Sequence, residues 1–161
     1  MITLKTPAAR PHHAARPALP STHTLDKTHH EVLHRLEQLA ALVAQLDDAG
    51  HTEALRTLAA DICSYFDGPA RAHHEAEEQL LFPRLQGHPD TTLTSHVRRL
   101  QQEHGWLEDD WLELGPHLQA VAHGFSWADV ESLRLGVPAF AQLYREHIAL
   151  EEAIVYPAGQ A

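Results

Sequence analysis

Apolar residues recur every three or four positions through most of the chain, which is the spacing of amphipathic helices. The pattern predicts four helices, over residues 24–48, 52–85, 90–114 and 126–156. Gly68 and Pro69 predict a kink or break in the second helix, and Pro138 predicts a distortion in the fourth. Residues 115–125 read as a longer connection with room for one helical turn. No stretch of the sequence shows the strict alternation of a strand. Long helices joined by short connections predict an all-α fold, an up-down-up-down antiparallel four-helix bundle.

The length, net charge and cysteine content limit the number of domains, the partners and the cellular location that we expect. Residues 23–161 are enough for one bundle with its own core, whereas residues 1–22, a mixture of Pro, Ala, Arg and His, are expected to form a flexible tail. Twelve basic and 22 acidic residues give a net charge of −10, which argues against nucleic acid or an anionic membrane as a partner. No stretch is long and apolar enough to span a membrane. The single Cys63 excludes an internal disulfide and favours a reducing, cytoplasmic location, with the thiol buried.

Residues 30–34 spell HEVLH, the H-E-x-x-H pattern of zinc proteases. That chemistry needs both histidines to face one pocket. A rotation of ~100° per residue instead places His30 and His34 opposite the apolar stripe of the first helix. The stripe contains Leu25, Val32, Leu36, Leu39 and Val43. His29 lies at its edge, so we expect His29 to face inward and interpret the protease pattern as a chance match.

The second helix adds a carboxylate to the interior. His73 and Glu77 are four residues apart, so both lie on the apolar face of this helix. An ionised Glu on such a face is costly unless it is paired or binds a metal ion. His74 and Glu78 have the same spacing on the flank of the helix, where we expect a solvated salt bridge.

The third and fourth helices repeat the first and second. His104 lies on the apolar stripe of the third helix, with Glu108 one turn later on the same face. In the fourth helix His147 and Glu151 share the apolar face, whereas Glu152 points away. That face also carries Leu133, Phe140, Leu143 and Ile154. Corresponding histidines of the two halves are 75 and 74 positions apart, which indicates a duplicated helix pair.

The inward histidines and carboxylates would form a polar cluster in the middle of the bundle. A salt-bridged network without metal is one interpretation, but the apolar stripes contain no Lys or Arg to neutralise the carboxylates. Imidazole and carboxylate ligands without thiolate favour iron, manganese or zinc, and six or seven of them suggest two six-coordinate ions. The predicted metal ligands are His29, His73, Glu77, His104, Glu108, His147 and Glu151.

The sequence resembles the hemerythrin-like family, the HHE cation-binding domains, over residues 24–157. The most specific elements are two segments of the form H-x-x-x-E-E-x-x-[LV]-[FY]-P, which begin at His73 and His147, and the EHGWL segment around His104. The resemblance implies as ligands His29, His73, Glu77, His104, His147 and a carboxylate of the fourth helix. Hemerythrins proper have a histidine where this chain has Glu108, and their last carboxylate corresponds to Glu152. Helix geometry favours Glu151, and Glu152 is the alternative.

The resemblance also implies a function. It implies an oxo- or hydroxo-bridged diiron centre, with zinc or manganese as other metals, that binds dioxygen, nitric oxide or peroxide for sensing, storage or detoxification. A redox enzyme similar to peroxidases or nitric-oxide reductases is the alternative, for which Glu108 is the best indication, and a divalent-metal buffer is a third. We expect a monomer or a homodimer. The apolar residues expected around the metal are Val32, Phe66, Leu107, Trp111 and Phe140.

Overall fold

The computed structural model describes residues 21–46 and 51–160, with only the backbone of Thr22 and His23. Within these ranges the regular elements are helices and no strand is present, as predicted. The expected tail over residues 1–22 lies almost wholly outside the described residues, as does the expected end of the first helix at Asp48. No helix in the described ranges has the length and apolar character needed to cross a membrane.

The first two helical segments begin at capping residues and the second contains two π-helical turns. In α1 (Thr22–Gln45) the hydroxyl of Ser21 accepts a hydrogen bond from the backbone N–H of Thr24. The second segment runs without a break through α2 (Glu53–Tyr65), η1 (Phe66–Ala70), α3 (Arg71–Ala76), η2 (Glu77–Leu81) and α4 (Phe82–Leu85). The irregularity expected at Gly68 and Pro69 is the π turn η1, through which the helix continues.

The third segment is one long helix, α5 (Thr91–His123), capped at its start by the side chain of Asp90. The connection expected over residues 115–125 is wrong, because α5 ends only at Gly124, whose φ of 71° is left-handed. The helix continues through Pro116 because its seven-residue apolar repeat also continues. The buried residues of that repeat include Leu100, Leu107, Leu114 and Val121.

The fourth segment comprises α6 (Val130–Leu150), η3 (Glu151–Val155) and α7 (Tyr156–Gln160). It begins later than expected because the side chain of Asp129 accepts a hydrogen bond from the N–H of Ser132 and caps α6 there. Pro138 lies inside α6 without ending it. The end expected at residue 156 is wrong, since Pro157 lies in the first turn of α7, where a proline is tolerated.

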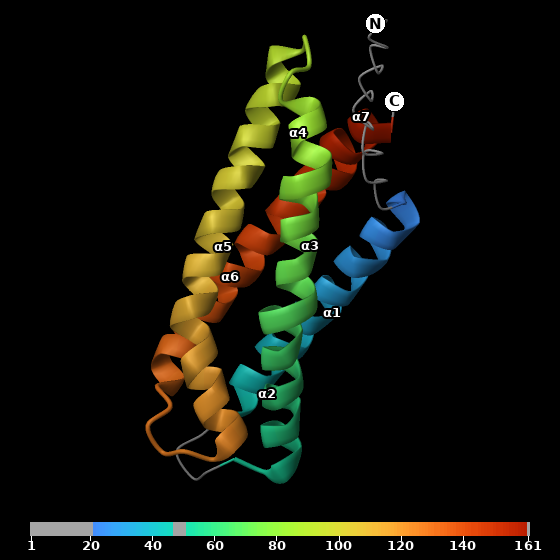
Figure 1. Ribbon diagram of the computed structural model, residues 1–161. Helices are drawn as coiled ribbons and strands as arrows, with labels where there is room; N and C mark the ends of the chain where they lie inside the picture. Colours follow the sequence, from blue (N-terminus) through green and yellow to red (C-terminus); the bar gives the residue numbers. More distant parts are fainter. Residues whose placement is uncertain (1–20, 47–50, 161) are drawn as a thin grey trace, which may run out of the picture.

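The four segments enclose one interior. Figure 1 shows α5 beside the α2–α4 segment, with α1 and α6 crossing behind them. α5 packs against α2 and α6, and α1 packs against the same two helices. The interior holds a larger apolar cluster, in which Cys63 is buried as expected, and a smaller one that includes residues of α4 and α7. Buried histidines and glutamates lie near the boundary between the two clusters along each segment, as His104 does between Leu100 and Leu107.

Candidate metal centre

Each helical segment contributes one buried histidine to a common layer. These are His29 from α1, His73 from α3, His104 from α5 and His147 from α6, and none is more than 8% exposed. Their Nε2 atoms face one another in two pairs. The Nε2 atoms of His29 and His73 are 3.1 Å apart. Those of His104 and His147 are also 3.1 Å apart, so four imidazoles converge on the middle of the molecule.

Two buried carboxylates link these pairs. Glu77 and Glu151 are the first residues of the π turns η2 and η3, and they are 1% and 0% exposed. Glu151 Oε2 lies 3.2 Å from His29 Nε2, and Glu151 Oε1 lies 3.1 Å from His147 Nε2. The oxygens of Glu77 likewise lie 3.4 and 3.5 Å from one imidazole of each pair. Each carboxylate therefore contacts both histidine pairs.

These contacts define two positions at which a cation fits. Within each position the ligand atoms lie no more than 4.8 Å from one another. The first position is formed by His29, His73, Glu77 and Glu151. The second position is formed by His104, His147, Glu77 and Glu151. The two positions therefore share both carboxylates.

Carboxylates outside the cluster orient three of the imidazoles. The pairs, each joined through the histidine Nδ1, are His29 with Glu152 at 2.9 Å, His104 with Glu78 at 2.9 Å, and His147 with Glu103 at 3.1 Å. An ionised carboxylate only accepts hydrogen bonds, so each Nδ1 donates, and a ring that gives up its other proton directs an Nε2 lone pair into the cluster. Histidines that bind metal ions are commonly held in this way.

The charged groups of the cluster shift one another's pKa. Burial alone would raise the pKa of Glu151, but His147 and His29 hold it well below its usual value. Burial and the charge of Glu151 raise the pKa of Glu77 to about 7. Burial would lower the pKa of His147, but Glu151 and Glu103 outweigh it and raise the value to about 10. The cluster therefore holds protons that a bound cation would displace.

Three buried oxygen atoms of the cluster have no hydrogen-bond partner. They are Glu77 Oε2 and both carboxylate oxygens of Glu151. Imidazole nitrogens lie near them without hydrogen-bonding geometry, and buried polar atoms left in this state are costly. A cation between the carboxylates and the Nε2 lone pairs would satisfy them, so the residues present fit a metal site.

Six of the seven residues predicted as metal ligands lie together in this cluster, and Glu108 does not. The Glu108 side chain is 55% exposed and forms an ion pair with Arg71 at 3.3 Å. We expected it on the inward face because it follows His104 by four residues. The buried stripe of α5 instead follows a seven-residue repeat through His104 and Leu107, which leaves residue 108 on the flank.

The structure also places the neighbouring residues that the sequence left open. Glu151 lies in the cluster, whereas Glu152 is 44% exposed and accepts the hydrogen bond of His29 Nδ1 from outside. His30 and His34 are exposed, as predicted. The zinc-protease pattern therefore contributes nothing to the site.

Tyr156 reaches the first position, which the helix rotation did not predict. Its hydroxyl lies 2.9 Å from His29 Nε2 and donates a hydrogen bond to Glu77 Oε1. In an α-helix, a residue five positions after Glu151 points ~140° away from it. The backbone N–H of Tyr156 instead bonds the carbonyl of Glu151, and this π-turn hydrogen bond brings both side chains to one face.

His74 and Glu78 do not form the solvated salt bridge expected for them. Glu78 accepts a hydrogen bond from His104, and His74 stacks on the His104 ring with 4.0 Å between centroids. The Nε2 atom of His74 lies 3.2 Å from the hydroxyl of Tyr144. With His104 and His147, His74 forms a third group of potential metal ligands, beside the second position.

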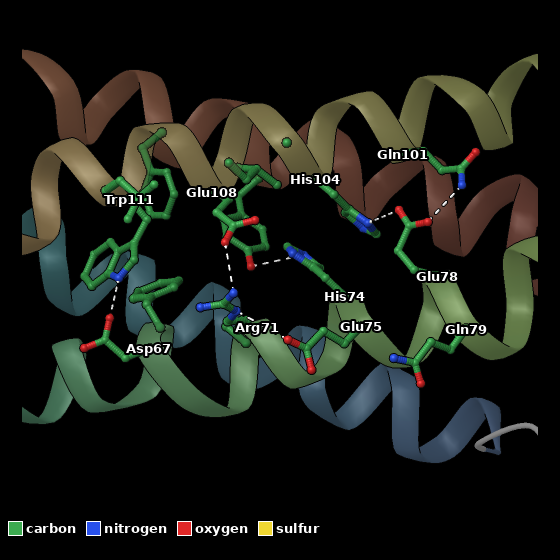
Figure 2. Close-up of a pocket in the computed structure, with 17 residues that line it drawn as sticks. Asp67, Arg71, His74, Glu75, Glu78, Gln79, Gln101, His104, Glu108 and Trp111 are labelled. Atoms are coloured by element: carbon green, nitrogen blue, oxygen red, sulfur yellow. Dashed lines mark hydrogen bonds and ion pairs between the residues drawn. The ribbon is translucent and has the colours of Figure 1, made fainter.

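A cleft of about 550 Å³ reaches the second position from the surface. It lies between the second helical segment and α5, with His74 and His104 projecting into it from opposite sides (Figure 2). Four of the apolar residues expected around the metal line it, namely Phe66, Leu107, Trp111 and Phe140. The exposed ion pair of Arg71 and Glu108 also borders the cleft. The cleft thus gives an approach from outside to His104 of the second position.

Comparison with known proteins agrees with this geometry. The family model of the hemerythrin HHE cation binding domain matches residues 21–158. An uncharacterized protein from Haemophilus influenzae is 32% identical over 126 residues, which are 78% of this chain and 71% of the relative. No solved structure matches the chain. The extent of the family match, together with the histidine and glutamate cluster, shows that this chain belongs to the hemerythrin HHE cation-binding domain family.

Proposed function

We propose that this chain binds two metal ions in the cluster between its four helical segments. The first ion is held by His29 and His73, the second by His104 and His147, and Glu77 and Glu151 bridge them. The observation that carries the proposal is the set of buried, unpartnered carboxylate oxygens that lie beside imidazole Nε2 atoms. Membership of a cation-binding family supports it.

The donor set favours iron. Imidazoles and carboxylates without thiolate suit iron, manganese and zinc, and carboxylate-bridged pairs of ions in helix bundles are typically iron or manganese. When bound, iron supplies the capacity to bind and reduce small molecules such as dioxygen, nitric oxide or peroxide. Glu78, Glu103 and Glu152 hold three imidazoles in the tautomer that binds a metal ion and increase their basicity.

The residues around the second position suit a small, weakly polar ligand. Phe66, Trp111 and Phe140 make one end of the cleft apolar, which disfavours bulk water there. His74 and Tyr144, which share a hydrogen bond, place polar atoms beside the second position. We therefore propose dioxygen, nitric oxide or a peroxide as the ligand, in sensing, storage or detoxification.

Metal analysis and absorption spectroscopy test this function. After expression with iron, we expect about two iron atoms per chain, the number that two four-ligand positions allow. The spectrum should change on reduction and return reversibly on exposure to air. Reproducible binding of a single zinc ion per chain, without iron, would contradict the proposal.

The size of the cleft favours a second candidate, a redox enzyme that consumes peroxide or nitric oxide with an organic reductant. About 550 Å³ is more than a diatomic ligand needs and lies in the range of sites for small organic molecules. The same spectra distinguish the two candidates. Stable, reversible bands favour ligand binding, whereas rapid irreversible oxidation with turnover of peroxide or nitric oxide favours the enzyme.

We also propose that the four segments follow the up-down-up-down antiparallel order. Residues 86–90 connect α4 to α5 and are too few to span the length of either neighbouring segment, so α5 returns alongside the second segment, where it packs against α2. Cys63 is buried and free, which supports a reducing and therefore cytoplasmic location.

A further inference from the structure

The phenol of Tyr156 lies among the ligand atoms of the first position. Its hydroxyl oxygen is 2.9 Å from His29 Nε2 and 3.3 Å from His73 Nε2, and it donates a hydrogen bond to Glu77 Oε1. The side chain is buried, with 2% exposed. One oxygen atom therefore contacts three of the four groups that form this position.

A neutral phenol does not satisfy these neighbours. Its single proton is donated to Glu77, so its oxygen faces the imidazoles with lone pairs alone. His29 Nδ1 donates to Glu152, so once the ring is neutral its Nε2 presents a lone pair to the same oxygen. A cation between these atoms would bind all of them, and the oxygen of Tyr156 would be one more ligand.

The duplicated half of the chain shows that packing does not require this hydroxyl. Tyr156 and Phe82 occupy the same place in the repeated H-x-x-x-E-E segment. Tyr156 stacks on His29 with 5.1 Å between ring centroids, and Phe82 stacks on His104 with 5.4 Å. Phe82 is fully buried, so an aromatic ring without oxygen fills this place well. The hydroxyl is a chemical difference between the first and second positions.

We propose that Tyr156 binds the ion in the first position as a phenolate. This inference rests on the proposed function, because it requires a metal ion there. On binding, the O–H bond breaks, an oxygen–metal bond forms, and the proton leaves to solvent with those displaced from the imidazoles, without any oxidation or reduction. Tyr156 thus completes the first position with protein ligands. The second position, which borders the cleft, is the one that keeps room for an external ligand.

Spectroscopy of the iron-loaded, oxidised protein tests this role without an activity assay. Phenolate bound to ferric iron gives a visible absorption band and resonance-Raman ring vibrations that imidazole and carboxylate ligands do not give. We expect both signals in the native protein and their loss in Tyr156→Phe. Tyr144→Phe is the matched control, because that hydroxyl is also buried and lies beside the second position, and it should keep both signals. Signals that persist in Tyr156→Phe, or vanish in Tyr144→Phe, would overturn the assignment.

A double variant tests the same assignment without altering Tyr156. The chain has three tyrosines, so replacing Tyr65 and Tyr144 with Phe leaves Tyr156 as the single source of a phenolate. Tyrosinate signals in this double variant support the proposal, and their absence at full iron loading refutes it. Iron content separates the two proposals. A native protein that binds no iron defeats both, whereas about two irons per chain without a tyrosinate signal defeats the role of Tyr156 alone.

Discussion

At the scale of single residues, both ring nitrogens have a partner in three of the four imidazoles, namely His29, His104 and His147. His147 directs Nε2 toward Glu151 at 3.1 Å and donates from Nδ1 to Glu103 at 3.1 Å. Glu103 is itself held by Arg99, with 2.6 Å between Nε and Oε1. A surface arginine and a buried carboxylate thus fix the ring that would bind the second ion. The Glu-Glu pairs after His73 and His147 were the available sequence signal for Glu78 and Glu152, but nothing comparable marked Glu103.

Replacing this supporting carboxylate should weaken the second position. Glu103→Gln removes one acceptor oxygen and introduces a donor, so the tautomer and orientation of His147 are no longer fixed. We expect metal affinity to fall about 10- to 100-fold, measured by competition with a chelator. Glu131→Gln is the matched control, because Glu131 is 69% exposed and forms a surface ion pair with Arg134. Equal losses in both variants would show that net charge, and not the orientation of His147, causes the effect.

The opposite faces of α1 give a second prediction at this scale. His29→Ala removes a ligand of the first position, so we expect lower iron content and a lower thermal midpoint, since metal binding and folding are coupled. His30 and His34 are exposed, and replacing both with Ala should change stability by no more than roughly 0.5 kcal/mol. Iron content and thermal unfolding of the two variants provide the measurement. Retention of iron in His29→Ala with loss in the double variant would reverse our assignment of the faces.

At the scale of elements, sequence periodicity succeeds where a helix is regular and fails where its register changes. The spacing of four residues between His147 and Glu151 was enough to predict their common face, because α6 is regular there. Beyond Glu151 the π turn changes the register, so Ile154, expected inside, is 40% exposed and Tyr156 is buried. Glu108 was misplaced for a related reason, because α5 follows a seven-residue repeat more closely than a rotation of ~100° per residue. The π turn cannot be read from the spacing of apolar residues alone, whereas the seven-residue repeat of Leu100, Leu107, Leu114 and Val121 is itself present in the sequence.

The π turn η3 should tolerate a deletion that a regular turn does not. Deleting Ile154 leaves Tyr156 four residues after Glu151, which an α turn places on the same face, so iron content and the tyrosinate signal should survive. Deleting the exposed Ala149 instead rotates Glu151 by ~100° relative to His147. We expect the second deletion to lose iron. Metal analysis and Raman spectra of both variants check this, and equal loss of iron would mean that the π turn itself is required.

At the scale of the whole molecule, the buried polar layer makes stability depend on pH and on metal. Burial alone would lower the pKa of His147, but Glu151 and Glu103 raise it to about 10. Because this value is above the ordinary 6.5, the pair of His147 and Glu151 stabilises the metal-free fold fully below pH 6.5 and loses that contribution as pH rises toward 10.

We therefore expect the thermal midpoint of the metal-free protein to fall by several degrees between pH 7 and pH 10. The loaded protein should change less, because a bound ion takes the place of the displaced protons. Thermal unfolding of both forms across this range is the measurement. A midpoint of the metal-free protein that rises with pH would contradict the protonation of His147.

The duplication has a consequence for how the chain is assembled. Each half supplies three of the four ligands of one position, and the fourth is the carboxylate of the other half, Glu151 for the first position and Glu77 for the second. If the chain is divided after Gly87, in the connection between α4 and α5, neither fragment contains a complete position. We expect the two fragments to associate at least tenfold more tightly with iron than after chelation, as analytical ultracentrifugation can measure. Association that does not depend on iron would mean that apolar contacts alone join the halves. Association that depends on iron would show that each half supplies the carboxylate that completes the metal position of the other half.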